Sequence, residues 1–306
     1  MRGETRLYAV NDVVVVSEEV GRALAERRPV VALETTLVAH GFPPGQGIEV
    51  GLESERRVRA AGGVPATIGV LDGKLRVGLT EDELGRFGPD ARKVGPRDLG
   101  AAIVQRAVGA TTVGGTLAAC RAVGIGFMGT GGLGGVHRGF PTPPDVSADL
   151  GELLRSEALV VSSGVKSILD VPATAELLET LGVPVLGYRT DDLPLFYAAH
   201  GGPPVSARVD SAREAALIAK THWALGRHSS VVLARPADES LDDVEPLIES
   251  ALATARAERV EGQAVTPFVL SYLHRESGGR TLTANRELVA ANAELAAEVA
   301  VAYADL

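Results

Sequence analysis

The sequence is poor in cysteine, long apolar runs and positive charge. Cys120 is its single cysteine, so no intramolecular disulfide can form, which is typical of proteins in a reducing compartment. No run of about eighteen consecutive apolar residues could span a bilayer, and the opening segment MRGETRLYAV lacks the apolar core of a signal peptide. We therefore expect a cytoplasmic protein that has no membrane partner.

The formal net charge is −9, whereas a general nucleic-acid binder needs a basic surface to neutralise the phosphate backbone. No nucleic-acid partner is expected, although a local basic pocket for one phosphate is compatible with this charge. Aromatic residues make up 4% of the chain and hydrophobic residues 45%. The core must therefore consist mainly of Ala, Val, Leu and Ile.

Short apolar runs alternate with amphipathic segments along the chain. Runs of this kind are typical of strands that are covered on both faces: Val30–Leu33, Ala66–Val70, Gly124–Met128, Leu159–Val161, Pro184–Leu186 and Ser230–Leu233. The amphipathic segments are expected to be helices: 47–61, 97–107, 173–181, 211–225 and 241–260. This alternation predicts one α/β/α domain over residues 1–306, with a mainly parallel or mixed central sheet and helices on both faces.

Two further patterns mark helix ends. Thr80 and Glu83 have the spacing of a capping box, which predicts a short helix starting there. The last forty or so residues, rich in Ala, Glu and Leu, are expected to form two helices broken at Gly278-Gly279.

A glycine-rich segment, 129–134, matches the dinucleotide-binding pattern G-x-G-x-x-G after a predicted strand. That pattern must open a helix, but here three prolines between positions 141 and 144 follow, and a helix interior does not tolerate them. The context thus argues against a dinucleotide site. The loop could still bind a phosphate through its backbone N–H groups, with charge from His137 and Arg138, and an ordinary turn is equally compatible.

Two lysines are candidates for covalent or electrostatic chemistry. Lys166 follows the predicted strand 159–161, and ligands of open α/β sheets bind at that carboxyl edge. A desolvated lysine there could attack a carbonyl and form a Schiff base, although a lone loop lysine is more often simply solvated. Lys93 is ambiguous in the same way. It could pair with a substrate oxygen or favour the neutral form of Lys166 by like-charge repulsion.

Three acidic residues stand out. Glu34 ends a buried strand, where burial raises the pKa of a carboxyl group toward a general-acid role. Asp145 and Asp149 flank Ser147, which could cap the following helix, while Asp149 could favour its first turn. Carboxylates plus water would suit Mg²⁺ or Mn²⁺ better than zinc, but paired carboxylates are common and do not decide the question.

Together these segments resemble the pseudouridine-5'-phosphate glycosidase family. The matching stretches follow one another along nearly the whole chain: ALETT with His40-Gly41, VPATIG from Val64, GATTV from Gly109, GGVHRG from Gly134, SADL from Ser147, KSILD from Lys166, THWALG from Thr221 and Ala284-Asn285.

The family joins or splits pseudouridine 5'-phosphate and uracil plus ribose 5-phosphate. The resemblance implies that Lys166 is a Schiff-base nucleophile, that Glu34 is the proton donor, and that Lys93 contacts the sugar and assists Lys166. It also implies that Asp145 holds a divalent metal, Mn²⁺ or alternatively Mg²⁺, largely through waters, and that the protein is a homotrimer. The remaining implied substrate contacts are Val113, Thr130, Ser147, Ala148, Asp149, His137 at the phosphate and Asn285 at the base.

Several loops depart from the family pattern, among them 42–47, 95–97, 114–115 and 190–195. These departures leave the implied catalytic residues in place but put the accepted base in question. A C-glycosynthase that couples ribose 5-phosphate to another uracil- or maleimide-like ring is therefore an open alternative. A non-catalytic sugar-phosphate-binding protein is a more remote one.

Overall fold

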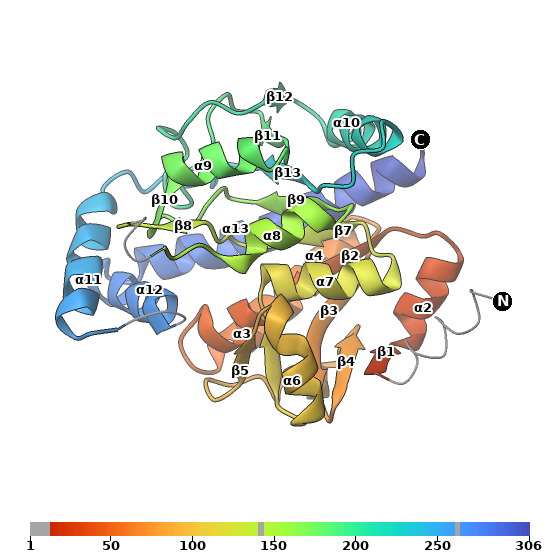
Figure 1. Ribbon diagram of the computed structural model, residues 1–306, viewed down its shortest axis with the longest axis horizontal. Helices are drawn as coiled ribbons and strands as arrows, with labels where there is room; N and C mark the ends of the chain where they lie inside the picture. The colour runs from red at the N-terminus through yellow and green to blue at the C-terminus, as the bar shows by residue number, and fades with distance from the viewer. Residues whose placement is uncertain (1–12, 140–143, 261–263) are drawn as a thin grey trace.

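The computed structural model describes residues 13–139, 144–260 and 264–306 (Figure 1). Within these residues an eleven-stranded sheet has the main order β1-β4-β3-β2-β7-β9-β13-β11-β12, with β5 and β6 branching from β3. Most pairs are parallel, so the predicted fold class is confirmed. The strands of this sheet are β1 Val14–Val16, β2 Val30–Glu34, β3 Val64–Leu71, β4 Lys74–Val77, β5 Arg92–Val94, β6 Gly109–Thr111, β7 Phe127–Gly129, β9 Leu159–Ser162, β11 Val185–Tyr188, β12 Ala207–Val209 and β13 Val231–Ala234.

A second, two-stranded antiparallel sheet is formed by β8 Val136–His137 and β10 Leu169–Asp170. The helices are α2 Glu18–Ala25, α3 Thr36–His40, α4 Gln46–Ala60, α5 Glu81–Leu84, α6 Leu99–Val104, α7 Val113–Val123, α8 Ala148–Arg155, α9 Val171–Thr180, α10 Ala212–Ala224, α11 Glu245–Ala257, α12 Val265–Glu276 and α13 Arg280–Ala304, with one 3₁₀ turn at Pro96–Asp98. None of the described helices is both long and apolar enough to cross a membrane.

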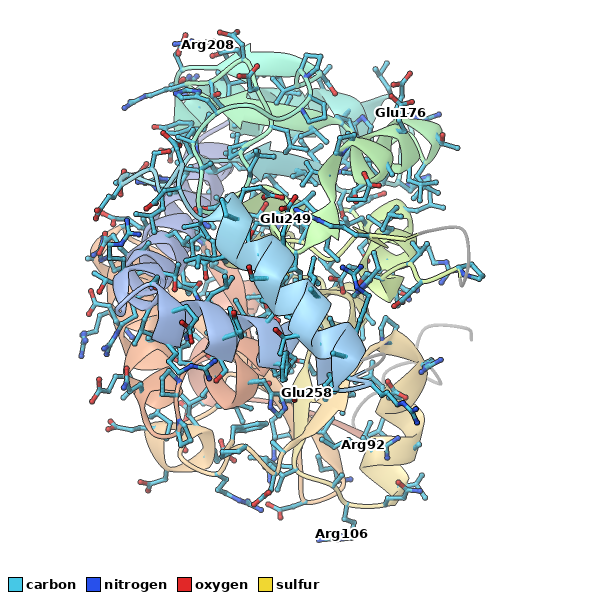
Figure 2. All side chains as sticks on the ribbon, turned by 90° about the vertical axis from the view of Figure 1, so that its left-hand side faces the viewer. Arg92, Arg106, Glu176, Arg208, Glu249 and Glu258 are labelled. Carbon is cyan, nitrogen blue, oxygen red and sulfur yellow. The ribbon has the colours of Figure 1, made fainter. Side chains whose placement is uncertain are left out.

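The sheet is covered on both faces because neighbouring residues of a strand point to opposite sides. In β2, Val31 and Leu33 pack into a cluster with α10 and α13, whereas Ala32 packs into the cluster that includes α7 and α8. Figure 1 shows α7 and α8 on one side of the sheet and the long α13 on the other. Charged side chains such as Glu176, Arg208 and Glu249 lie on the exposed outer surface (Figure 2).

All six predicted strands are present, and the expected helix ends are found. Thr80 and Glu83 form the capping box of α5, and the chain breaks between α12 and α13 at Gly278-Gly279. The third predicted strand begins later than expected, at Phe127, because Gly124 ends α7 in the left-handed region (φ 82°). The helix predicted over 97–107 is shorter and follows the 3₁₀ turn.

Helix α13 lies unusually close to the end of β7. A Cβ atom on Gly129 would lie 2.7 Å from the Cα of Ala293, closer than two such atoms can approach. The absence of a side chain at this one position therefore allows the backbone of α13 to lie against the strand, directly beside the loop that follows it.

Candidate active site

Three neighbouring parallel strands deliver polar groups to one edge of the sheet. Strand β2 ends at Glu34, Thr130 follows β7, and Lys166 follows β9 after a short loop. Because β2, β7 and β9 are adjacent and parallel, their carboxyl ends meet at the position where α/β sheets bind ligands. Lys93 lies on β5, which runs in the opposite direction to these strands. Strand β5 is parallel to β6, and β6 is antiparallel to β3.

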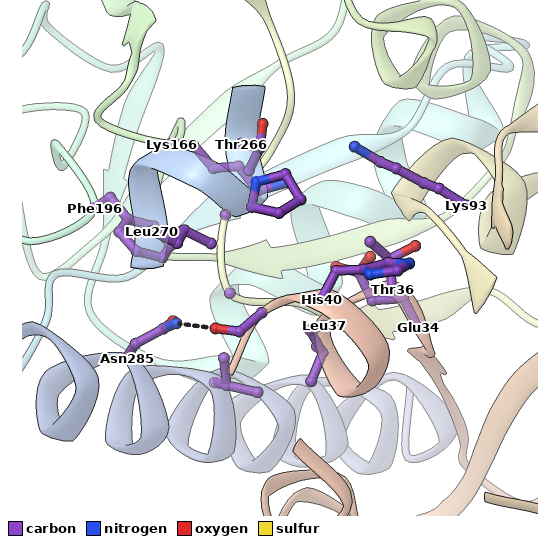
Figure 3. A pocket seen from close by; sticks show the side chains of 15 residues that line it. Glu34, Thr36, Leu37, His40, Lys93, Lys166, Phe196, Thr266, Leu270 and Asn285 are labelled. Atoms are coloured by element: carbon purple, nitrogen blue, oxygen red, sulfur yellow. Dashed lines mark hydrogen bonds between the residues drawn. The ribbon is translucent and has the colours of Figure 1, made fainter. Parts of the chain in front are cut away.

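Two connected cavities open at this edge. The larger one, here called the outer cavity, has a volume of about 310 Å³, and most of its lining residues are polar or charged. The smaller one, here called the inner cavity, has a volume of about 50 Å³. Figure 3 shows the inner cavity, with Lys166, Lys93 and Glu34 around it. The residues that line both cavities are Glu34, Thr36, Lys93, Lys166 and Thr266. The three residues for which the sequence implied catalytic roles therefore lie together at the junction.

The carboxyl group of Glu34 is almost fully buried at this junction. Burial raises its pKa, while Lys166 and a 2.5 Å hydrogen bond from the Thr130 hydroxyl to Oε1 pull the pKa in the opposite direction. A carboxyl group with a raised pKa is suited to donate a proton near neutral pH. The structure thus shows the burial and the raised pKa that were predicted from the position of Glu34 at the end of a buried strand.

Lys93 is half-buried, and the pKa of its amine is lowered, first by desolvation and then by the positive charge of Lys166. Desolvation lowers the pKa of the His137 imidazole, Asp145 partly offsets this, and the charges of the same two lysines lower the pKa further. The two lysines line the same cavity and can each donate N–H groups to an anion such as a phosphate ester.

The outer cavity is lined by His137, Asp145, Ser147, Ala148 and Asp149, as the sequence implied. Ser147 caps α8 by accepting a hydrogen bond from the Asp149 backbone N–H, which confirms the predicted cap. The carboxylate of Asp149 is buried, and its two oxygens accept from the backbone N–H groups of Gly114 (2.8 Å) and Gly134 (3.0 Å). Asp149 therefore joins two segments of the cavity wall.

The inner cavity is more apolar. Leu37, Phe196, Leu270 and Val289 form much of its lining, and Asn285 contributes a side-chain amide. The Asn285 Nδ2 donates to the Gly41 carbonyl over 3.4 Å, which leaves its Oδ1 available to a ligand (Figure 3). A flat ring with an apolar face and an N–H donor would suit this space.

Two of the implied substrate contacts lie behind the cavity walls. Thr130 is fully buried and contacts Glu34, and Val113 is buried at the start of α7, next to Thr112, which does line the outer cavity. Conversely, Thr36, Thr266, Phe196 and Leu270 line the site but were not singled out from the sequence. Of these four, only Thr36 could have been recognised from the sequence, because it stands two residues after Glu34.

The glycine-rich loop does not lead into a helix. Strand β8 follows it, and the next helix in the chain, α8, begins at Ala148. Without a helix N-terminus for the pyrophosphate, the dinucleotide alternative lacks its binding site, as the sequence context indicated. The prolines at 141 and 143 lie outside the described residues.

The site offers few direct metal ligands. Within the described residues, no group of three or more His, Cys, Asp and Glu side chains could hold a metal ion. Asp145 is half-exposed at the outer cavity, with the His137 ring 3.6 Å away, and each oxygen of Asp149 accepts one backbone hydrogen bond. One carboxylate of this kind fits a hard cation that keeps most of its waters, and does not fit zinc.

Comparison with known proteins gives the family. Residues 19–302 match the model of the family described as indigoidine synthase A like protein. The chain belongs to this family. Pseudouridine-5'-phosphate glycosidase of Geobacillus kaustophilus is 45% identical over 297 residues, covering 95% of this chain and 99% of that protein. The enzyme of the same name from Herpetosiphon aurantiacus is 47% identical over 295 residues, covering 94% and 97%. The predicted resemblance is confirmed.

Two solved structures that share the fold are similar to this chain. The prealnumycin C-glycosynthase AlnA in complex with ribulose 5-phosphate has a TM-score of 0.87 and 42% identity, covering 96% of this chain and 97% of its own. An indigoidine synthase A-like protein from Thermotoga maritima has a TM-score of 0.84 and 37% identity, covering 94% and 96%. These relatives confirm the expectation of an enzyme.

Proposed function

We propose that this protein makes and breaks the C–C glycosidic bond between ribose 5-phosphate and uracil, as its relatives named pseudouridine-5'-phosphate glycosidase do. The observation that carries this proposal is the meeting of Glu34, Lys93 and Lys166 at the junction of the larger outer cavity and a more apolar inner one. The reaction needs an acid and an amine at the point where a sugar joins a ring.

The two cavities match the two halves of the substrate. The outer cavity has room for a sugar phosphate, and Lys93 and His137 in its lining supply N–H donors to an anion. One edge of the ring would enter the inner cavity and the rest would lie at the junction, because a six-membered ring needs more than the 50 Å³ of the inner cavity. Asn285 would accept from a ring N–H, and the apolar side chains would cover the inserted edge. The bond to be broken then lies at the junction, beside Lys166 and Glu34.

A carbon leaving group requires more than the two carboxylates of an ordinary glycosidase. In our proposal Glu34 protonates the ribose ring oxygen while Lys166 Nζ attacks C1', so that the C1'–O bond breaks and the ring opens. The secondary ammonium formed by this attack gives a proton back to the Glu34 carboxylate, and the freed nitrogen lone pair then forms a C=N bond as the C–C bond to the base breaks. The base leaves with the bonding electrons and takes up a proton at carbon. Water adds to the imine and releases the aldehyde of ribose 5-phosphate and the free amine.

We further propose that Asp145 holds Mn²⁺, with Mg²⁺ as the alternative, through water molecules at the outer cavity. A hydrated divalent ion there would neutralise negative charge on the sugar phosphate. Lys93 and His137 line the same cavity and would contact the sugar phosphate directly. A homotrimer and a cytoplasmic location stay predictions, and light scattering of the purified protein would test the first.

A second function is favoured by a specific observation. The solved relative with 42% identity is a C-glycosynthase, and in the inner cavity here Leu37, Phe196, Leu270 and Val289 lie beside the amide of Asn285. The same chemistry run toward bond formation would couple ribose 5-phosphate to another uracil- or maleimide-like ring.

The deciding experiment incubates the protein with ribose 5-phosphate, Mn²⁺ and one ring at a time, and measures products by mass spectrometry. Efficient formation of pseudouridine 5'-phosphate from uracil supports the glycosidase. A strong preference for another imide ring assigns the synthase. Binding of ribose 5-phosphate without any coupled product, and without cleavage of pseudouridine 5'-phosphate, contradicts both and favours a sugar-phosphate-binding protein.

A further inference from the structure

Asn292 is a fully buried polar residue in the Ala-rich middle of α13, and it lines neither cavity. Its Nδ2 carries two hydrogens and lies within hydrogen-bond distance of three acceptors, so one hydrogen is shared. The acceptors are the carbonyl of Thr130 (2.8 Å), the hydroxyl of Ser163 (3.1 Å) and the carbonyl of Gly131 (3.3 Å). Backbone carbonyls can only accept, so they fix which end of the amide faces the loop. A buried amide with these partners is costly to replace, because its loss leaves the partners unpaired.

The three acceptors belong to two loops that each lead to a catalytic group. Thr130 follows β7, and its hydroxyl donates to the carboxylate of Glu34 over 2.5 Å. Ser163 follows β9 and stands three residues before Lys166. The Asn292 side chain therefore connects Thr130, which hydrogen-bonds to Glu34, to the loop that carries Lys166.

The two loops are also paired with each other next to this point. Ser163 N–H donates to the Gly131 carbonyl, Leu133 N–H to the Gly164 carbonyl, and Lys166 N–H to the Leu133 carbonyl, over 2.8 to 3.0 Å. These bonds fix each loop relative to the other. Asp149 on α8 also bonds to one of these loops, at the Gly134 N–H. Among the described residues, Asn292 is the side chain from another element that hydrogen-bonds to both loops.

We infer that Asn292 is a positioning residue, whose amide sets the distance between Glu34 and Lys166 from behind the site. This inference rests on the proposed function, because it assigns Glu34 and Lys166 to acid and amine chemistry. An error of about 1 Å between reacting groups costs on the order of 10²-fold in rate, and supporting hydrogen bonds are what hold such geometry. Substrate binding depends on other residues and should change little.

The test compares two substitutions that act on the same network. Ser163→Ala removes one arm of the Asn292 network with minimal change in volume, and Asn292→Ser removes all three. Ser54→Ala is the matched control, because Ser54 is equally buried but bonds only to Val50 of its own helix. For each variant we would measure kcat and KM with pseudouridine 5'-phosphate, the pH profile of kcat, the melting temperature, and the rate of borohydride trapping with ribose 5-phosphate.

We expect Asn292→Ser to lower kcat by about 10²-fold and Ser163→Ala by about tenfold, each with less than a threefold change in KM. The limb of the pH profile that reports Glu34 should move to higher pH, because the Thr130 hydroxyl no longer holds its hydrogen bond firmly. Ser54→Ala should leave kcat unchanged per folded molecule.

The inference is overturned if kcat per folded molecule and the pH profile of Ser163→Ala match those of the wild type, whatever the melting temperature does. This readout remains available even where Asn292→Ser fails to fold. Trapping in the wild type distinguishes a failure of the proposed function from a failure of the role of Asn292. Absence of trapping in the wild type refutes the proposed function, whereas normal trapping in the wild type and equally in Ser163→Ala refutes only the role of Asn292.

Discussion

The hydroxyl of Thr130 donates a 2.5 Å hydrogen bond to the carboxylate of Glu34, and both groups are buried. This bond stabilises the ionised form and partly offsets the rise in pKa that burial causes. Thr130→Val removes the donor and keeps the shape, so the pKa of Glu34 should rise further. The limb of the pH–rate profile that belongs to Glu34 should move to higher pH, and kcat measured across pH 5–9 would show it. An unmoved limb would mean that another group supplies the proton.

The raised pKa of Glu34 also makes the stability of the fold depend on pH. In the pH range above 4.5, the ordinary value of the carboxyl group, the folded state holds this proton more firmly than the unfolded state does. The contribution of Glu34 to stability is therefore present at low pH and is lost as the pH rises through its folded pKa. Glu34→Gln removes this loss, so the variant should melt at a higher temperature than the wild type at pH 8, with the difference shrinking toward pH 4. Its kcat should fall by at least about 10²-fold. Calorimetry at both pH values provides the check.

Lys166→Ala should abolish turnover and leave the fold intact, because the amine that forms the imine is missing. Trapping with borohydride and ribose 5-phosphate should add mass to the wild type at the peptide that contains Lys166, and none to the variant. Lys220, exposed on α10, is the control: Lys220→Ala should trap normally. Substantial turnover by Lys166→Ala would remove the Schiff base from the mechanism.

Asp145→Asn should weaken the dependence of activity on Mn²⁺, since the neutral amide binds a hydrated divalent ion poorly. The measurement is a metal titration of the chelator-treated enzyme, with the exposed Asp238→Asn as a matched charge control. The half-saturating Mn²⁺ concentration should rise by about tenfold or more, which corresponds to about 1.4 kcal/mol. An unchanged titration would place the ion elsewhere.

Asp149→Asn should destabilise the wall of the outer cavity. An asparagine has one acceptor oxygen for the two N–H groups of Gly114 and Gly134, so one buried N–H loses its partner. The expected cost is about 1–3 kcal/mol in the free energy of unfolding. Urea denaturation would measure it beside Asp90→Asn, a substitution on the exposed surface. Equal midpoints for the two variants would show that this bridge contributes nothing to stability.

The sequence predicted the parts of the site that depend on where a strand ends. Glu34 and Lys166 each follow a buried apolar run, and the carboxyl ends of parallel strands share an edge. Which strands are neighbours could not be read in the same way, because the adjacency of β2, β7 and β9 depends on long crossover connections. The position of Lys93 depended on the reversed direction of β5, a three-residue strand without an apolar run.

Residues that act from behind the site were harder to recognise. Asn292 stands in a helix rich in alanine, where an isolated polar residue gives no sign of whether it faces solvent or the interior. Thr130 was implied as a substrate contact, but the structure places it under Glu34, because β7 and β2 are hydrogen-bonded neighbours. Such roles depend on tertiary packing between segments far apart in the chain, which local patterns do not contain.

The tight packing around the glycine-rich loop has a consequence for how this enzyme can change by mutation. A Cβ on Gly129 would clash with the backbone of α13, and one on Gly132 would lie 2.6 Å from the ring of Phe196. At these two positions of the G-x-G-x-x-G pattern, glycine is therefore present because a side chain would not fit. In a saturation library, these two positions should accept almost no alternatives, whereas Leu37 and Leu270 at the inner cavity should tolerate many. Substitutions in the apolar lining of the inner cavity could therefore change which ring is accepted. The glycine-rich loop between Glu34 and Lys166 should tolerate few substitutions.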